Sequence, residues 1–390
     1  MDFNKMNPLF ETIKIALATT PSQPVLIWGA DGCGKSRGIL SLIEDMENTD
    51  GSPVKSWFLN GNSMEPTDMA GLFAREDEKG WGRVPVLRAL KEAVEETAAG
   101  RQYVFVFEEF TTMNKATMAP FLSFISEKVA GDCRYNEDLI HIIALANPPE
   151  IAVNPTHLAP PVSTRFLHLQ WEMDFGYWAE NMMEGTWFPG TQEAAADVIS
   201  FLYSKGAMPG RSASFASSGF AEIPSREFMN KTRGNPRTWT NLIKMDTTAR
   251  TLGVEFSTRK ILFRGAVGEG MGREFGSWLQ MKSEGIDPIE ALKDPENVIL
   301  PVQTDRVFAF FNAVAARVST SMDPKEWQSA WVLLGRCDDK DLGVLAARTL
   351  AKLPKKEGGR KLFAGGFPKE ISEFGDLLLE LKSLFSKLGK

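Results

Sequence analysis

One eight-residue motif constrains this chain more than any other feature. Gly29-Ala30-Asp31-Gly32-Cys33-Gly34-Lys35-Ser36 fits the pattern G-x-x-x-x-G-K-[ST], in which backbone N–H groups surround phosphate oxygens. The strand-like run QPVLIW precedes the motif, and apolar residues follow it at helical spacing: Ile39, Leu42, Ile43 and Met46. Strand, glycine loop and helix form the context that this motif requires. We therefore expect all eight residues to bind a nucleotide, with Lys35 on the β- and γ-phosphates and the Ser36 hydroxyl on Mg²⁺.

The nucleotide expected in this loop is ATP. The segment Asn114-Lys115-Ala116-Thr117 lacks the aspartate of the NKxD motif that reads guanine. Cys33 lies inside the loop, near a helix N-terminus that lowers thiol pKa values, so a redox role is one alternative. The simpler interpretation is that Cys33 is a small residue at a variable position.

Short apolar runs in the first 172 residues predict the strands of a parallel sheet flanked by helices. They span residues 23–28, 54–59, 103–107, 139–146 and 166–171. We expect a nucleotide-binding α/β core over 1–172, a helical lid over 173–265 and a helical C-terminal region over 266–390. A Gly/Ser/Pro-rich stretch, 205–224, predicts a surface loop.

A last helix is predicted over residues 370–387. Its apolar residues recur at helical spacing: Ile371, Phe374, Leu378, Leu381 and Phe385. This face either packs on the protein's own core, the simpler interpretation, or docks a partner.

Composition excludes several classes of protein. Of 390 residues, 43% are hydrophobic and 24% charged, which excludes a fully disordered, collagen-like or disulfide-scaffold chain. The net charge of −6 argues against a dedicated nucleic-acid binder. No apolar run approaches the ~18 residues that a membrane helix needs, and the first residues, MDFNKMNPLF, lack the basic stretch and apolar core of a signal peptide, so we expect neither feature. Three widely spaced cysteines, Cys33, Cys133 and Cys337, fit neither a disulfide framework nor a zinc site, so we expect the reducing cytoplasm.

The predicted strand at residues 103–107 is followed by two acidic residues. Residues 101–110 read RQYVFVFEEF, which places Glu108 and Glu109 directly after a buried apolar run. ATPases with a phosphate loop place a magnesium carboxylate and a water-orienting glutamate there. We predict Glu108 as the magnesium-side carboxylate and Glu109 as the catalytic residue. Glu108 is one methylene longer than the usual aspartate, and the simpler alternative is a pair of solvated carboxylates.

Three further polar residues follow in order along the chain. Asn147 ends the apolar run 138–149 and is a candidate to sense the γ-phosphate. Arg165 precedes the last predicted strand and is a candidate arginine finger toward a neighbouring subunit's nucleotide. Arg237 follows Gly234-Asn235-Pro236, where proline predicts the first turn of a helix, and is a candidate to touch phosphate.

Taken together, the motifs resemble the MoxR-type AAA+ ATPases of the helix-2-insert group, which also holds magnesium-chelatase-like and dynein-related modules. The resemblance spans about residues 20–260 and rests on GADGCGKS, EPTDMAGLF, FEEFTTMNKATMAPFLSFISE, ALANPPE, STRF and GNPRTW. The EEFTT and ANPPE forms are most similar to the branch found beside von Willebrand factor A-like (VWA) proteins.

The resemblance implies a site shared between subunits of a ring, usually a hexamer. It implies Walker B roles for Glu108 and Glu109, sensor 1 for Asn147, the arginine finger for Arg165 and sensor 2 for Arg237. It also implies that residues 72–85 form an insert hairpin lining a central pore, with Trp81 displayed between Gly80 and Gly82. A plain surface hairpin is the alternative.

These expectations leave three functions open. The first is an ATP-driven, chaperone-like machine that remodels or activates a partner protein, with a VWA-domain protein as the expected partner. The second is a nucleotide-gated assembly protein with weak or no hydrolysis, motivated by Glu108. The third, a nucleic-acid motor or nuclease-partner ATPase, is opposed by the acidic balance of charges.

Overall fold

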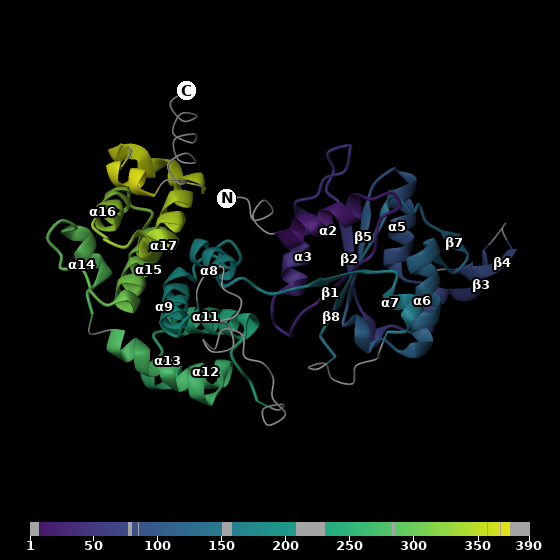
Figure 1. Cartoon of the computed structure of the whole chain (residues 1–390), viewed down its shortest axis with the longest axis horizontal. Helices are drawn as coiled ribbons and strands as arrows, with labels where there is room; N and C mark the ends of the chain where they lie inside the picture. The colour runs from purple at the N-terminus through teal and green to yellow at the C-terminus, as the bar shows by residue number, and fades with distance from the viewer. Residues whose placement is uncertain are drawn as a thin grey trace. The chain divides into compact units, whose positions relative to one another are not determined.

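The chain divides into two compact units in a computed structural model, Met1–Glu172 and Met173–Lys390 (Figure 1). The structure describes residues 8–76, 80–84, 86–149, 158–207, 231–282, 285–356, 358–366 and 368–374.

The first unit is built on a five-stranded, wholly parallel sheet with the order β2-β5-β8-β1-β9. Its strands are β1 (Val25–Trp28), β2 (Lys55–Asn60), β5 (Tyr103–Glu108), β8 (Ile140–Ala146) and β9 (Leu167–Gln170). Each predicted strand is present, shifted by no more than two residues at either end, and the predicted fold class is confirmed. Strands β5, β8 and β1 are neighbours and run parallel. The loops that follow these three strands therefore lie along one edge of the sheet.

The alternation of side chains along β5 shows how the sheet is buried on both faces. Tyr103, Phe105 and Phe107 point to one face and pack with helices α5 (Arg88–Ala98) and α6 (Lys115–Glu127). Val104 and Val106 point to the other face, which α2 (Pro8–Ala18) and α3 (Lys35–Glu44) cover (Figure 1). The buried residues of α3 include Ile39, Leu42 and Ile43, as the helical spacing predicts.

Two small hairpins project from this core. Strands β3 (Leu72–Glu76) and β4 (Gly80–Val84) pair antiparallel over the segment where an insert hairpin is expected. Strands β6 (Val129–Ala130) and β7 (Cys133–Arg134) form the second hairpin. Short helical segments complete the unit: η1 (Gly61–Ser63), α4 (Pro66–Ala70), η3 (Phe110–Thr112) and α7 (Pro160–Ser163).

The second unit is helical throughout its described part. Its elements are α8 (Phe175–Glu184), α9 (Gln192–Ser204), α11 (Pro236–Thr251), α12 (Phe256–Val267), α13 (Glu269–Lys282), α14 (Pro288–Lys293), α15 (Thr304–Ser321), α16 (Pro324–Gly335), α17 (Lys340–Lys352), η6 (Leu353–Lys355), η7 (Gly359–Gly365) and η8 (Lys369–Glu373). One continuous hydrophobic core joins these helices and buries Trp178, Trp239, Trp327 and Trp331. The core runs across residue 265, and the division of this unit there stays a prediction.

Two sequence-based expectations fall partly outside the described residues. Most of the predicted surface loop, from residue 208 onward, is not described, and neither is the predicted terminal helix beyond Phe374. The first residues of that helix form a 3-10 turn instead, η8, and Ile371 and Phe374 pack into the unit's own core. Among the helices that the structure describes, none is long and apolar enough to cross a membrane.

Candidate nucleotide site

The glycine loop takes the backbone shape that its sequence predicts. Gly32 and Gly34 have φ angles of +68° and +86°, which residues with a Cβ adopt only under strain. Gly34 caps helix α3, which begins at Lys35, so the loop runs directly into a helix N-terminus. Such a terminus attracts anions through its backbone N–H groups and its dipole.

Lys35 is bonded to both the loop and a neighbouring strand. Its Nζ donates to the carbonyl oxygens of Gly29 (2.6 Å) and Ala30 (2.9 Å) and to Oδ1 of Asn147 (2.9 Å). Asn147 directly follows β8, the neighbour of β1, and this explains why two residues 112 positions apart meet.

Glu108 and Glu109 reach the same edge from β5, on the far side of β8. The Ser36 hydroxyl donates a short hydrogen bond to Oε1 of Glu108. Asn147 Nδ2 donates to Oε2 of Glu109 at 3.3 Å. The structure therefore brings five predicted site residues into one cluster, with Asn147 between the lysine and the second glutamate.

Glu109 has a left-handed backbone, with φ +50° and ψ +41°. For a residue with a side chain this costs about 1–2 kcal/mol, and glutamate offers no local compensation of the kind that glycine or asparagine does. This backbone conformation directs the exposed Glu109 side chain away from the line of β5 and toward Asn147. Strain of this kind concentrates at functional sites.

Sequence reasoning missed the glycine that makes room for this turn. A Cβ on Gly61, just after β2, would lie 3.1 Å from the carbonyl oxygens of both Glu108 and Glu109. The Asn60-Gly61 pair at a strand end signals only an ordinary turn, because nothing in it shows that another strand's turn packs there.

It also missed Trp171, which closes over the glycine loop from the end of β9. The indole Nε1 donates to the carbonyl oxygen of Cys33 (3.0 Å), and the ring covers Gly38 of α3. The Trp171 carbonyl oxygen lies 2.8 Å from where a Cβ on Gly29 would be. Burial raises the pKa of the Cys33 thiol, which opposes the low-pKa thiolate that a redox role requires.

Arg165 lies at the opposite edge of the sheet. It precedes β9, whereas the glycine loop follows β1, and the two strands are parallel. Its guanidinium donates from Nε to Ser126 Oγ and from Nη1 to the Pro161 carbonyl oxygen. Arg165 therefore cannot reach the cluster around Lys35 of its own chain.

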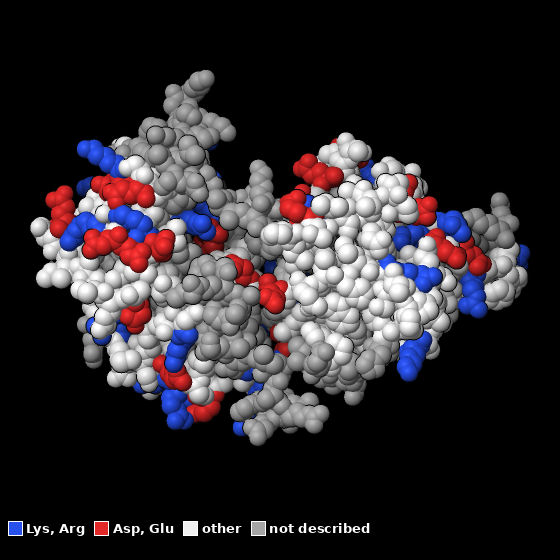
Figure 2. All heavy atoms as spheres, viewed as in Figure 1, with Lys and Arg blue, Asp and Glu red and all other residues white. Residues whose placement is uncertain are grey.

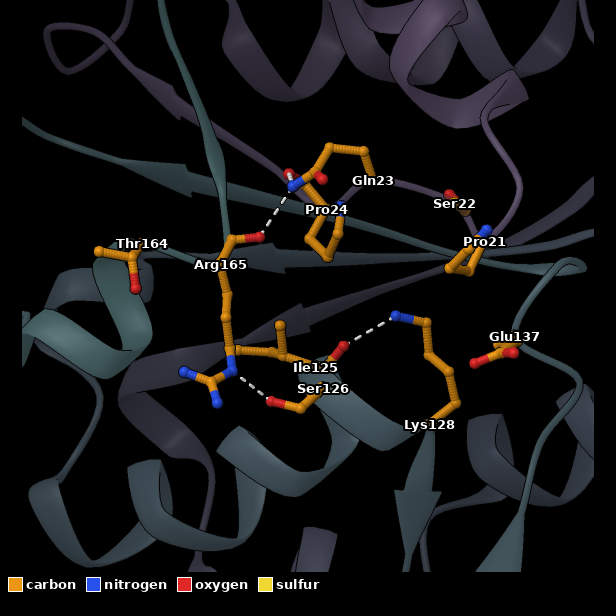
Figure 3. A pocket seen from close by; sticks show the side chains of 10 residues that line it. All are labelled: Pro21, Ser22, Gln23, Pro24, Ile125, Ser126, Lys128, Glu137, Thr164 and Arg165. Atoms are coloured by element: carbon orange, nitrogen blue, oxygen red, sulfur yellow. Dashed lines mark hydrogen bonds between the residues drawn. The ribbon is translucent and has the colours of Figure 1, made fainter.

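A cavity of about 310 Å³ adjoins Arg165 at that edge (Figure 3). Buried Lys128 lines it together with Glu137 and donates from Nζ to the Ile125 carbonyl oxygen (2.8 Å) (Figure 3). Burial lowers the pKa of Lys128 to about 8, and Glu137 opposes that shift.

Arg237 belongs to the second unit. Asn235 caps α11 by accepting from the Thr238 N–H (2.9 Å), Pro236 occupies the first turn, and Arg237 follows with an exposed side chain. The predicted helix start is confirmed, while the role of Arg237 as a phosphate contact stays a prediction.

The donor set of the cluster fits Mg·ATP. A serine hydroxyl and a carboxylate, Ser36 and Glu108, are hard oxygen donors beside a phosphate-binding loop, and Mg²⁺ is bound in proteins by one or two carboxylates together with substrate phosphates. Gly29–Ser36 supplies the N–H groups and the lysine that the phosphates require.

Comparison with known proteins adds little to this geometry. No protein-family model and no curated protein matches the chain. Among solved structures, the Holliday junction branch migration motor RuvB of Thermotoga maritima is 13% identical over 77% of this chain and 79% of that chain, with a TM-score of 0.32. A DNA polymerase III gamma subunit-related protein of the same organism is 11% identical over 96% of this chain and 98% of that chain, with a TM-score of 0.35. TM-scores this low carry no conclusion about this chain.

Proposed function

We propose that this chain is a Mg·ATP hydrolase of the MoxR-type AAA+ group that acts as a hexameric ring and remodels or activates a partner protein. The observation that carries the proposal is the bonded cluster at the carboxyl edge of the sheet, in which Lys35 contacts Asn147, Asn147 contacts Glu109 and Ser36 contacts Glu108. Ligands of open parallel sheets bind at this edge.

In the proposed reaction, the loop N–H groups and Lys35 hold the phosphates of ATP. Phosphate oxygens replace the Gly29 and Ala30 carbonyl oxygens as acceptors for Lys35 Nζ. Glu109, oriented by the Asn147 amide, holds the attacking water and accepts its proton. Magnesium, held by Ser36 and Glu108, would neutralise negative charge on the β- and γ-phosphates.

Arg165 would act on the nucleotide of a neighbouring subunit. Its position at the amino edge of the sheet separates it from its own glycine loop, so only another copy can bring the two together. A guanidinium there stabilises charge that develops on the transferred phosphoryl group. Arg237 would contact phosphate from the second unit.

The test is Mg²⁺-dependent ATP turnover over a series of protein concentrations. We expect specific activity to rise with concentration, Lys35→Ala to abolish binding and turnover, and Glu109→Gln to bind ATP without turnover. A mixture of Lys35→Ala and Arg165→Ala proteins should regain part of the activity, because one variant supplies the loop and the other the arginine. Unchanged turnover in Glu109→Gln would refute the assignment.

The length of Glu108 supports a second candidate, a nucleotide-gated assembly protein with weak hydrolysis. In this case ATP would order the ring and a partner would read its state. Glu108→Asp distinguishes the two: a large rise in turnover with tighter Mg²⁺ binding supports the gated candidate, and no change removes its main support.

The identity of the partner is a separate part of the proposal. A VWA-domain protein encoded beside this chain would be retained on the immobilised chain in the presence of ATP and released by the Lys35→Ala substitution. Retention that does not depend on nucleotide would contradict it.

A further inference from the structure

One surface of the first unit combines exposed aromatic and basic side chains. In the β3–β4 hairpin, Phe73 pairs with Arg83 and Arg75 pairs with Trp81. Residues that face each other across two antiparallel strands point to the same side, as do residues two apart along one strand. These four side chains therefore share one side of the hairpin, called here the front face.

The front face is open to solvent. Phe73 is 69% exposed and Trp81 is 67% exposed, and both arginines are exposed as well. Large apolar side chains at such exposure on adjoining strands mark interaction sites more often than isolated ones do. Figure 2 shows basic side chains, with acidic ones beside them, at the end of the first unit where Figure 1 places β3 and β4.

The aromatic rings are already arranged as a platform. Phe73 and Trp81 lie diagonally across the hairpin with their ring centroids 5.5 Å apart and their planes 18° from parallel. Arg75 and Arg83 occupy the other diagonal, so an arginine adjoins each ring across the strands. Both rings are exposed, so a further flat ring can reach and stack on this pair.

The back of the hairpin is held by the turn between β6 and β7. Asp132 Oδ2 accepts from the Arg83 N–H (2.7 Å), and the Asp132 N–H donates to the Arg83 carbonyl oxygen (2.9 Å). A Cβ on Gly82 would lie 2.8 Å from Asp132 Oδ2, so the carboxylate lies on the side opposite the front face. This contact fixes the hairpin and keeps the Asp132 carboxylate off the side that carries the arginines.

We propose that the front face, Phe73, Arg75, Trp81 and Arg83, binds single-stranded nucleic acid. Bases would stack on Phe73 and Trp81, and phosphates would pair with the two arginines. Aromatic stacking combined with arginine contacts is how proteins hold single strands without reading their sequence. Charge complementarity selects a polyanion, and the stacked rings favour nucleobases over an acidic polypeptide, which has no run of flat rings. The net charge of the whole chain does not oppose this, since Arg75 and Arg83 lie on the same side of the hairpin as the two rings.

The test is fluorescence anisotropy of a labelled oligothymidylate of about 20 nucleotides, which exceeds the roughly 4–16 that one small module covers. The full chain is titrated at several salt concentrations. We expect binding at low salt, and Trp81→Ala and Phe73→Ala should each weaken it by about tenfold or more. Arg75→Ala and Arg83→Ala should each reduce the slope of log affinity against log salt by about 0.7.

Matched controls separate binding from folding. Ile15→Ala removes a side chain of α2 that is 67% exposed, the same fraction as Trp81, and should leave the affinity unchanged. Trp81→Phe keeps a ring and should keep most of the affinity. Lys35→Ala should bind the oligonucleotide normally, which tests the front face apart from the proposed ATPase site.

Several results would overturn the proposal. They are no binding at low salt, an equal affinity of wild type and Trp81→Ala, or duplex DNA binding as tightly as the single strand. Displacement of the oligonucleotide by polyglutamate at equal charge concentration, together with tighter binding of polyglutamate, would assign the face to an acidic polypeptide instead.

Discussion

Substituting Gly38 by alanine tests whether Trp171 clamps the glycine loop. A Cβ at Gly38 would lie 2.1 Å from Cη2 and 2.6 Å from Cζ2 of the indole. The ring cannot simply move aside, because its Nε1 is hydrogen-bonded to the Cys33 carbonyl oxygen. The Phe10 ring also packs edge-on against the indole, with the ring centroids 5.4 Å apart. Either the indole or the start of α3 has to shift.

The expected loss follows from two opposing effects. Forcing extra volume into a packed core costs about 1–3 kcal/mol, and contacts this short fall in the upper part of that range, about 2–3 kcal/mol. Replacing glycine by alanine inside a helix returns about 1 kcal/mol. We therefore expect α3 to be destabilised by about 1–2 kcal/mol and ATP binding to weaken, because the loop carbonyl of Cys33 moves with the indole.

Amide hydrogen exchange is the appropriate assay because a chain of two units need not unfold in one step. Gly38→Ala should speed exchange in α3 by roughly 5- to 30-fold. Gly265→Ala in α12 is the matched control: its Cβ meets nothing within 4 Å, so exchange in α12 should slow.

A double substitution isolates the clash from other effects. In a Trp171→Leu background the space beside Gly38 is open, and Gly38→Ala should there stabilise α3 instead of destabilising it. The coupling between the two positions should be about 2–3 kcal/mol, within the range for residues in contact. The reasoning fails if Gly38→Ala slows exchange in α3 of the wild type, or speeds it equally in both backgrounds.

Two further substitutions probe buried polar groups. Asp246 is 1% exposed and accepts from Arg259 Nε (2.7 Å), so Asp246→Asn should cost the second unit about 3–5 kcal/mol in chemical denaturation. Glu269, which pairs with Arg273 on the surface, is the control: Glu269→Gln should cost less than about 1 kcal/mol, and similar losses for the two substitutions would contradict the argument. Burial lowers the pKa of His141 to about 4 from its ordinary 6.5, so the unfolded chain binds the extra proton first as pH falls. The free energy of unfolding of the first unit should then lose about 1.6 kcal/mol from this group between pH 6.5 and 5, and His141→Gln should reduce the pH slope by that amount; an unchanged slope would refute it.

The sheet was predictable because its signals are local. Apolar runs such as 139–146 report burial on both faces, and the glycine loop fixes where the first strand ends. Strand polarity then places Asn147, Glu108 and Glu109 at the edge that carries Lys35.

The residues that support the site were not predictable, because their partners lie far away in sequence. Trp171 closes on Cys33 across 138 residues, and Gly61 makes room for a turn that belongs to another strand. Neither residue type signals such a contact by itself. Local periodicity also overextended one element: the pattern from 370 onward predicts an α-helix, yet a 3-10 turn forms at Lys369–Glu373, where Ile371 and Phe374 pack into the core.

The position of Arg165 and Lys35 at opposite ends of two adjacent strands also governs how many sites an assembly can complete. On the proposed role of Arg165, each copy offers a loop at one edge and an arginine at the other, so copies add head to tail. A pair of copies completes one site and leaves one loop and one arginine unused. A linear assembly always has one incomplete site, and only a closed ring supplies every loop with an arginine. Activity per copy therefore measures the fraction of sites that are complete. It rises from half its full value in a pair to the full value in a closed ring.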